Sequence, residues 1–139
     1  TVSEDATGVM ASRDAQRPLI GVDVDMAEMS DLVPTLAAIA ACATSPTRIR
    51  GVGFIRAKES DRLGDLASEL GACGALVEVH DDGLAITPRA LRSAVVNPHD
   101  DHRLAMSLAL LGIRQAGIVV SDVSCSVIKS SWYRLASRG

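Results

Sequence analysis

The segment RAKESDRL is rich in charged residues and lies just before leucines at helical spacing. Lys58 and Arg62 are four residues apart and Glu59 and Arg62 are three apart, so on one helix their side chains would gather at its entrance. Cations are unexpected there, because a helix start already carries partial positive charge. A bound phosphate or carboxylate would account for them, and Glu59 among cations could hold or deliver a proton. Ordinary surface salt bridges are the alternative explanation.

A second helix start repeats this feature in the segment NPHDDHRLAM. His102 and Arg103 fall in its first turn, after an expected cap at Asp100 or Asp101. Two cationic helix starts in one short chain favour a site for an anion. The alternative for this segment is a metal site built from His99, His102 and a nearby Asp, which the spacing permits but which no third cluster supports.

Two further residues are open to a structural explanation. Asp31 lies at a third predicted helix start, where a role as a cap would explain it without any function. Lys129, near the end of the chain, would be read as an ordinary surface lysine if its own sequence context were considered alone.

The elements that must position these residues follow from hydrophobic periodicity. Residues 18–26 and 47–55 read as strands, residues 30–43 and 60–74 as helices, and residues 75–88 as a hairpin with its turn at Asp82-Gly83. Strand, helix, strand and a final helix then follow over 94–97, 100–115, 117–123 and 130–137. We therefore expect one domain, with a flexible or edge segment over 1–17, a β-α-β-α-β-β unit over 18–88 and an incomplete second unit over 89–139.

The two most apolar helices define the expected fold class. The helices that begin near Leu32 and Leu104 are apolar nearly all round, which predicts that they are buried. The hairpin alternates, with Glu78 and His80 on one face, so one side of its sheet should meet water. Buried helices beneath outward sheets predict an inside-out α/β domain.

Composition narrows the classes of function. The chain has 139 residues, 47% hydrophobic and 22% charged, as expected of a folded soluble domain. A formal net charge of -3 argues against nucleic acid as a partner, and the apolar stretches are too short to span a membrane. Cys42, Cys73 and Cys125 lack metal-site spacing and read as reduced, buried thiols, so we expect a cytoplasmic protein without a signal peptide.

The motifs RAKESDRL and DDHRLAMSLALLG resemble the two C-terminal signatures of 5-enolpyruvylshikimate-3-phosphate synthase, and VDVDMAEMSDLVPTLAAIA resembles the segment that precedes them. The resemblance runs from about residue 18 to residue 129 and implies a two-domain enzyme of repeated β-α-β-α-β-β units. Such an enzyme transfers the enolpyruvyl group of phosphoenolpyruvate to the 5-hydroxyl of shikimate 3-phosphate and releases phosphate, in the shikimate pathway to chorismate and the aromatic amino acids. It uses no metal and no organic cofactor, and glyphosate is the expected inhibitor of the full enzyme.

The resemblance also implies a role for each matching residue. Asp31 would serve as base toward the 5-hydroxyl, Lys58 would touch shikimate 3-phosphate and the reacting centre, and Glu59 would exchange the proton at the methylene carbon of phosphoenolpyruvate. The remaining residues would bind substrate, with the carboxylate of phosphoenolpyruvate held by Arg62 and Arg103, His102 beside them and Lys129 on the phosphate.

This chain also departs from the family pattern. The family has a Lys three residues after the position of Cys125, where this chain has Ile128, and Lys129 follows one residue later. Phe54 stands where some members carry a polar substrate contact. The chain is well under half of a family member and lacks the N-terminal domain, so we expect the isolated fragment to be inactive. A non-catalytic α/β module that retains an anion-binding half-site is the alternative.

Overall fold

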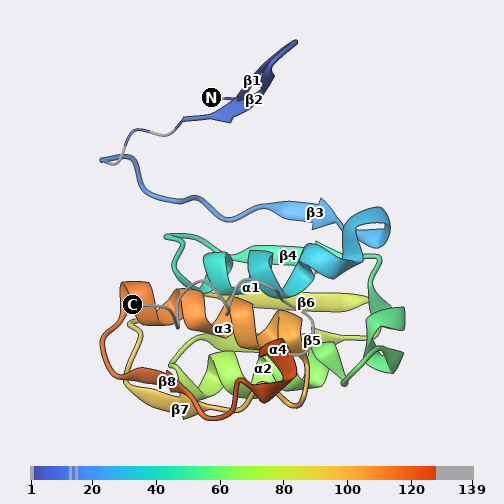
Figure 1. Cartoon of the computed structure of the whole chain (residues 1–139), viewed down its shortest axis with the longest axis vertical. Coiled ribbons are helices and arrows are strands. Elements are labelled where there is room, and N and C mark those ends of the chain that lie inside the picture. The colour runs from blue at the N-terminus through green and yellow to red at the C-terminus, as the bar shows by residue number, and fades with distance from the viewer. Residues whose placement is uncertain (1, 13, 15, 128–139) are drawn as a thin grey trace.

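The computed structural model describes residues 2–12, 14 and 16–127, and the predicted final helix and Lys129 lie outside them. The main sheet has the strand order β3-β4-β6-β5, with β3 parallel to β4 and the other neighbours antiparallel. Its strands are β3 (Asp23–Asp25), β4 (Thr47–Arg50), β5 (Leu76–His80) and β6 (Gly83–Thr87). The other strands form a parallel pair, β7 (Ala94–Val96) with β8 (Ile118–Val120), and a hairpin, β1 (Val2–Asp5) with β2 (Gly8–Ala11), that stands apart from the rest (Figure 1).

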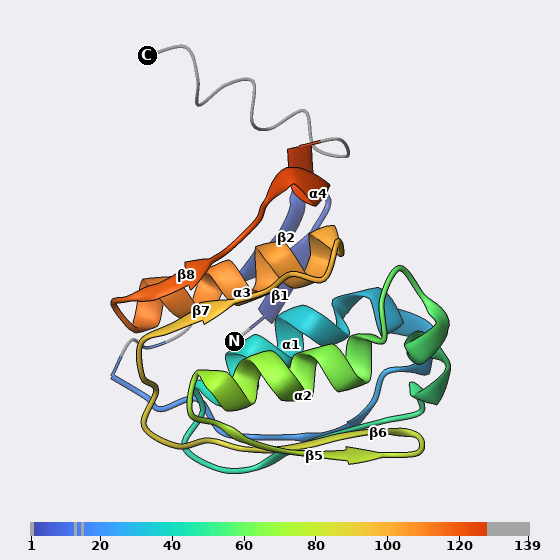
Figure 2. The same cartoon turned by 90° about the horizontal axis from the view of Figure 1, so that it is seen from below.

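The main helices lie on one face of the four-stranded sheet. Figure 2 shows α1 and α2 against that sheet, with α3 on their far side and β7 and β8 alongside α3. The bounds are α1 (Val33–Ala41), α2 (Arg62–Ala72), α3 (His102–Arg114) and a short α4 (Ser124–Val127), with 3₁₀ turns η1 (Ala27–Leu32) before α1 and η2 (Gly53–Ala57) before α2. The α/β class expected from the sequence is therefore confirmed.

Apolar periodicity explains how α2 packs. Leu63, Leu66 and Leu70 are fully buried, and they face Ile49, Leu84 and Ile86 of the sheet in one core cluster. Pro34 is tolerated in α1 because it lies in the first turn, where its missing N–H has no helical partner to lose. These two helices place their N-termini, which carry the charged motifs, at the same end of the molecule.

The second predicted strand is wrong beyond Arg50. The chain turns at Gly51, which has a φ of 74°, and residues 53–57 form η2 instead of continuing β4. This φ is one that side chains rarely adopt, and a side chain at Gly51 would also meet the Asp25 carboxylate, so the position favours glycine. The turn sends the motif Lys58–Arg62 back toward α1.

The predicted hairpin is confirmed, but its turn is shifted by one residue. His80 pairs with Gly83, so the loop consists of Asp81 and Asp82, and Gly83 already belongs to β6. Glu78 and His80 are exposed, as the alternation predicted. The sheet therefore has one face on the helices and one face in water.

The prediction that both apolar helices are buried is correct for α1 and wrong in part for α3. Six of the nine residues of α1 are buried. One side of α3 packs through Leu104, Leu108 and Leu111, but Met106 is 52% exposed and Ile113 is 85% exposed on its other side. The apolar side chains all round α3 thus led the prediction to overstate its burial within the part of the chain that the structure describes.

Helices α1 and α3 run parallel with a constant offset, and this brings distant motifs together. Thr35 Oγ1 lies 3.2 Å from Ser107 Oγ, and Arg103 hydrogen-bonds Asp31 from the same offset of 72 residues. Each helix connects two strands that pair in parallel, in the orders β3-α1-β4 and β7-α3-β8. The repeated β-α-β arrangement therefore sets the N-termini of both helices side by side.

Two further expectations from the sequence concern membrane-spanning segments and the state of the cysteine thiols. None of the described helices is long and apolar enough to cross a membrane. Cys73 is buried while Cys42 and Cys125 are only half-buried, and none of the three forms a disulfide. Burial raises the pKa of the Cys73 and Cys42 thiols, so both are protonated at neutral pH.

Candidate active site

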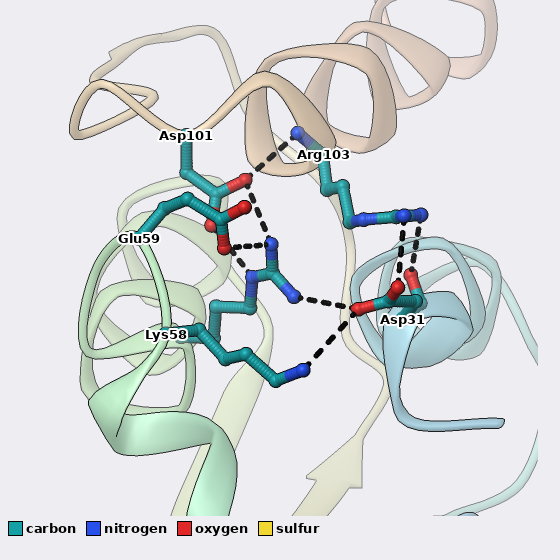
Figure 3. A network of polar contacts seen from close by, with 6 residues as sticks. Asp31, Lys58, Glu59, Asp101 and Arg103 are labelled. Atoms are coloured by element: carbon teal, nitrogen blue, oxygen red, sulfur yellow. Dashed lines mark hydrogen bonds and ion pairs between the residues drawn. The ribbon is translucent and has the colours of Figure 1, made fainter. Parts of the chain in front are cut away.

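Arg62 is the centre of the site, and its side chain is fully buried. Its Nε donates to Asp101 Oδ2 at 2.6 Å, and its terminal nitrogens donate to Glu59 Oε2 at 2.6 Å and to Asp31 Oδ1 at 3.1 Å. The three carboxylates come from η1, from the segment before α2 and from the residue before α3 (Figure 3). A guanidinium is stable inside a core only where such partners replace its hydration, so these contacts allow α2 to begin on a buried charge.

Asp31 links the same centre to two more cations. Its Oδ1 lies 3.8 Å from Lys58 Nζ, and its Oδ2 accepts a hydrogen bond of 2.9 Å from a terminal nitrogen of Arg103. Lys58 also lies over the ring of Phe54, 5.8 Å from the ring centroid, at cation–π distance. We call the connected set the charge network, and it consists of Asp31, Lys58, Glu59, Arg62, Asp101 and Arg103.

The structure corrects the expected cap at Asp31. Leu32 occupies the N-cap position of α1 and makes no side-chain cap hydrogen bond, while Asp31 lies inside η1. The 3₁₀ turn runs directly into α1, so the chain needs no separate cap there. The Asp31 carboxylate is therefore available for Arg62, Lys58 and Arg103.

The start of α2 also differs from the prediction. Asp61 caps the helix by accepting from the N–H of Gly64 at 3.1 Å, and α2 begins at Arg62. Lys58 and Glu59 therefore precede the helix and are not arranged by its periodicity. Their side chains still reach the site, because η2 and the following turn fold back over the N-terminus of α2.

Asp101 is the functional residue that sequence reasoning missed, since it was expected only as a cap. It does cap α3, accepting from the N–H of Arg103 at 2.8 Å, but it is also completely buried against Arg62. The available signal was an acid directly before the His102-Arg103 pair, in a chain with an arginine at the start of a leucine-rich helix. Pairing across 39 residues could not be read from either motif alone.

His102 begins α3 beside Arg103 and is half-buried. The structure gives its side chain no hydrogen bond or ion pair with the residues it describes. Those residues also contain no group of three or more His, Cys, Asp or Glu side chains placed to hold a metal ion. The motif residues that the structure brings together are thus the six of the charge network, with His102 at its edge.

Opposing effects set the charge state of the two aspartates. Burial alone would raise the pKa of Asp101, but the hydrogen bond from Arg62 and the N–H of Arg103 outweigh it and hold that pKa below its usual range. For Asp31 desolvation is likewise the largest single effect and would raise the pKa, but Arg62, Arg103 and Lys58 together outweigh it, so that pKa is also lowered. The same partners overcome burial at Arg62 and raise its pKa.

These shifts predict that the chain loses stability in acid. Because the folded pKa of Asp31 and of Asp101 lies below the unfolded value of about 3.9, their stabilisation is complete above that pH and is lost as the pH falls through the lower folded values. We expect the free energy of unfolding in urea to be nearly constant from about pH 7 to pH 5 and to fall below about pH 4. In Asp101→Asn the fall should be shallower, while the exposed control Glu78→Gln should follow the wild type. A fall of equal depth in Asp101→Asn would contradict this account.

The charge network is balanced, which differs from the cationic site for an anion that the sequence predicted. Its three cations face three carboxylates, so its formal charge is zero. An arginine has five N–H donors, and the contacts of Arg62 to Asp101, Asp31 and Glu59 use four of them. An incoming anion must therefore exchange places with an internal carboxylate or use the donors that remain.

Comparison with known proteins places these motifs in a family context. The family model of EPSP synthase (3-phosphoshikimate 1-carboxyvinyltransferase) matches residues 1–135. A 3-phosphoshikimate 1-carboxyvinyltransferase of Methanoculleus marisnigri is 49% identical over 107 residues, which are 77% of this chain and 25% of the relative. One of Methanosphaerula palustris is 39% identical over 140 residues, 99% of this chain and 33% of the relative.

A solved structure agrees with these sequence matches. The EPSP synthase of Acinetobacter baumannii superposes with a TM-score of 0.67 and 27% sequence identity, over 87% of this chain and 30% of that one. The chain thus spans a quarter to a third of the length of the relatives it matches.

Proposed function

This chain belongs to the EPSP synthase family, and we propose that it forms the C-terminal part of an enzyme that transfers the enolpyruvyl group of phosphoenolpyruvate to the 5-hydroxyl of shikimate 3-phosphate. One observation carries the proposal. Motif residues as much as 72 positions apart in the sequence form a single connected charge network at the entrances of α2 and α3. Such an arrangement suits small substrates that carry carboxylate and phosphate groups.

Exposure divides the cations into two roles. The side chains of Lys58 and Arg103 are 35% and 32% exposed, so an anion from solvent reaches them first. Arg103 suits the planar carboxylate of phosphoenolpyruvate, and Lys58 can act as a point charge beside the reacting centre. Arg62 is buried and can reach that carboxylate only through its remaining N–H, or after Glu59 or Asp31 moves. His102 lies at the rim of the same entrance.

The carboxylates supply the acid–base chemistry. Asp31 is 49% exposed and ionised, and it can accept the proton of the 5-hydroxyl as that oxygen attacks phosphoenolpyruvate. Glu59, whose side chain is 37% exposed, first takes up a proton, delivers it to the methylene carbon during addition and takes a proton back during elimination. Elimination breaks the bond to phosphate, and the cations stabilise the negative charge as it leaves.

The length of the chain bears on whether it is active by itself. Two thirds or more of each relative lies outside the match, and an open half-site holds a substrate less firmly than a closed one. We therefore propose that this chain is inactive by itself and contributes to the second of two domains. In that arrangement residues 18–88 and 89–139 are successive units, with helices inside and sheets outside, and Lys129 meets the phosphate.

Binding of phosphoenolpyruvate tests the half-site directly. We expect the chain to bind it weakly, with a Kd of about 1 mM or higher, and Arg103→Gln to weaken binding about tenfold. Arg50→Gln is a matched control, because Arg50 also pairs with an aspartate, Asp23, at 2.6 Å on the surface but lies outside the charge network. Chemical-shift titration would measure both variants. Equal binding by Arg103→Gln and the wild type would contradict the proposed half-site.

A further inference from the structure

The loop between β7 and α3, residues 97–101, delivers Asp101 to Arg62 in an unusual backbone conformation. His99 and Asp100 have φ values of 51° and 56°, so two consecutive residues that are not glycine lie in the left-handed region. Residues with a side chain are strained in this region, so a loop of this shape persists only where its surroundings hold it.

One face of α2 holds the loop at both of its ends. Asp65 and Glu69 follow Arg62 by three and seven residues along α2, so the three side chains lie on the same side of the helix. Arg62 binds Asp101 at the end of the loop. Glu69 meets its beginning, where its Oε2 accepts from the N–H of Asn97 at 3.0 Å.

The His99 ring makes a further contact between the loop and α2. Its Nε2 lies 2.8 Å from Glu69 Oε1, at hydrogen-bond distance, and its Nδ1 lies 3.5 Å from Asp65 Oδ1. The N–H of His99 donates to Asn97 Oδ1 at 2.8 Å, and Glu69 is only 8% exposed. A buried carboxylate such as that of Glu69 is stable only while its hydrogen-bond partners stay in place.

We propose that Glu69 and His99 are positioning residues, which lock residues 97–101 so that Asp101 orients the guanidinium of Arg62. They touch no substrate in this account. Their effect on the reaction passes through Asp101 to Arg62 and to the backbone that carries His102 and Arg103. The consequence for substrate rests on the proposed function, whereas the effect on Arg62 does not.

The test uses the Nε–H of Arg62, which is buried and bonded to Asp101, as a spectroscopic reporter. In Glu69→Ala we expect its exchange with solvent, measured by nitrogen-15 NMR, to accelerate by about tenfold or more, because Asn97 and His99 lose their acceptor and the loop opens. Glu69→Gln, which keeps one acceptor oxygen, should recover part of the protection. His99→Ala should give a smaller acceleration in the same direction.

Ser107→Ala is the matched control. Ser107 is also a buried polar residue of this core, 2% exposed, but its contact is with Thr35 at the seam of α1 and α3. This variant should leave the exchange of Arg62 within about twofold of the wild type. If Glu69→Ala does not fold, His99→Ala decides, because it leaves the bond between Glu69 and Asn97 intact. An Arg62 reporter unchanged in the folded variants would overturn the proposal, even if phosphoenolpyruvate still binds, and failure of that binding alone would leave it standing.

Discussion

Replacing Arg62 with methionine is expected to destabilise the chain by about 3–5 kcal/mol, a large part of the stability of a domain of this size. The substitution removes the guanidinium that bonds both Asp101, which is fully buried, and Glu59. Within the part of the chain that the structure describes, Asp101 would then keep only backbone N–H partners in the core, where an unpaired charge is costly. Urea unfolding followed by circular dichroism measures the loss.

A second substitution separates the cost of the unpaired charge from the loss of packing. Arg62→Met combined with Asp101→Leu removes both fully buried charges, and we expect it to recover part of the stability lost in Arg62→Met. Arg50→Met is the control, because Arg50 forms an ion pair of the same length with Asp23 on the exposed surface, and we expect little change there. A loss in Arg62→Met no larger than in Arg50→Met would mean that the charge network does not hold α1, α2 and α3 together.

Replacing Asp31 with asparagine is expected to affect binding and turnover in opposite directions. Asparagine keeps the shape of the side chain but removes the negative charge that pairs with Arg62, Lys58 and Arg103. The network then carries one net positive charge, so phosphoenolpyruvate should bind the chain about tenfold more tightly at low salt. The base toward the 5-hydroxyl is lost, so turnover by a reconstituted enzyme should fall about 10²- to 10⁴-fold.

Asp23→Asn provides the control for charge alone. Asp23 pairs with Arg50 on β4, outside the charge network, so its loss also adds one positive charge to the chain. We expect this variant to change neither quantity appreciably, because the added charge lies on an exposed strand. Weaker binding by Asp31→Asn, measured in the same chemical-shift titration, would show that Asp31 supports the anion instead of competing with it.

The sequence predicted what periodicity and local motifs determine. Leucine spacing located α2, the apolar run located α1, and the charged residues at the predicted helix starts gave five of the six residues of the charge network, all except Asp101. Periodicity failed where a single tertiary contact decides the local conformation. Strand β4 ends at Arg50, and the chain turns at Gly51, whose Cα lies close to the Asp25 carboxylate, an approach across 26 residues that no local pattern encodes.

The partners within the site could not be predicted, because they depend on long-range packing. Asp101 looks like a helix cap from its sequence and is one, yet its more important contact is with Arg62, 39 residues away. Asp31 looks like a cap and is not one, since η1 runs directly into α1 and releases its carboxylate. Motifs therefore identified the kinds of residue in the site, whereas the balance of charge within it required the structure.

Phosphate release from phosphoenolpyruvate plus shikimate 3-phosphate tests the central claim most directly. The chain would be assayed alone and then mixed with the unmatched part of the Methanosphaerula palustris relative, supplied as a separate polypeptide, with Glu59→Gln as the control. We predict no release by the chain alone, release by the mixture, and a loss of about 10²-fold or more in Glu59→Gln. No release from a mixture shown to associate, or release that Glu59→Gln does not diminish, would contradict the claim that this charge network is half of an enolpyruvyl transferase site.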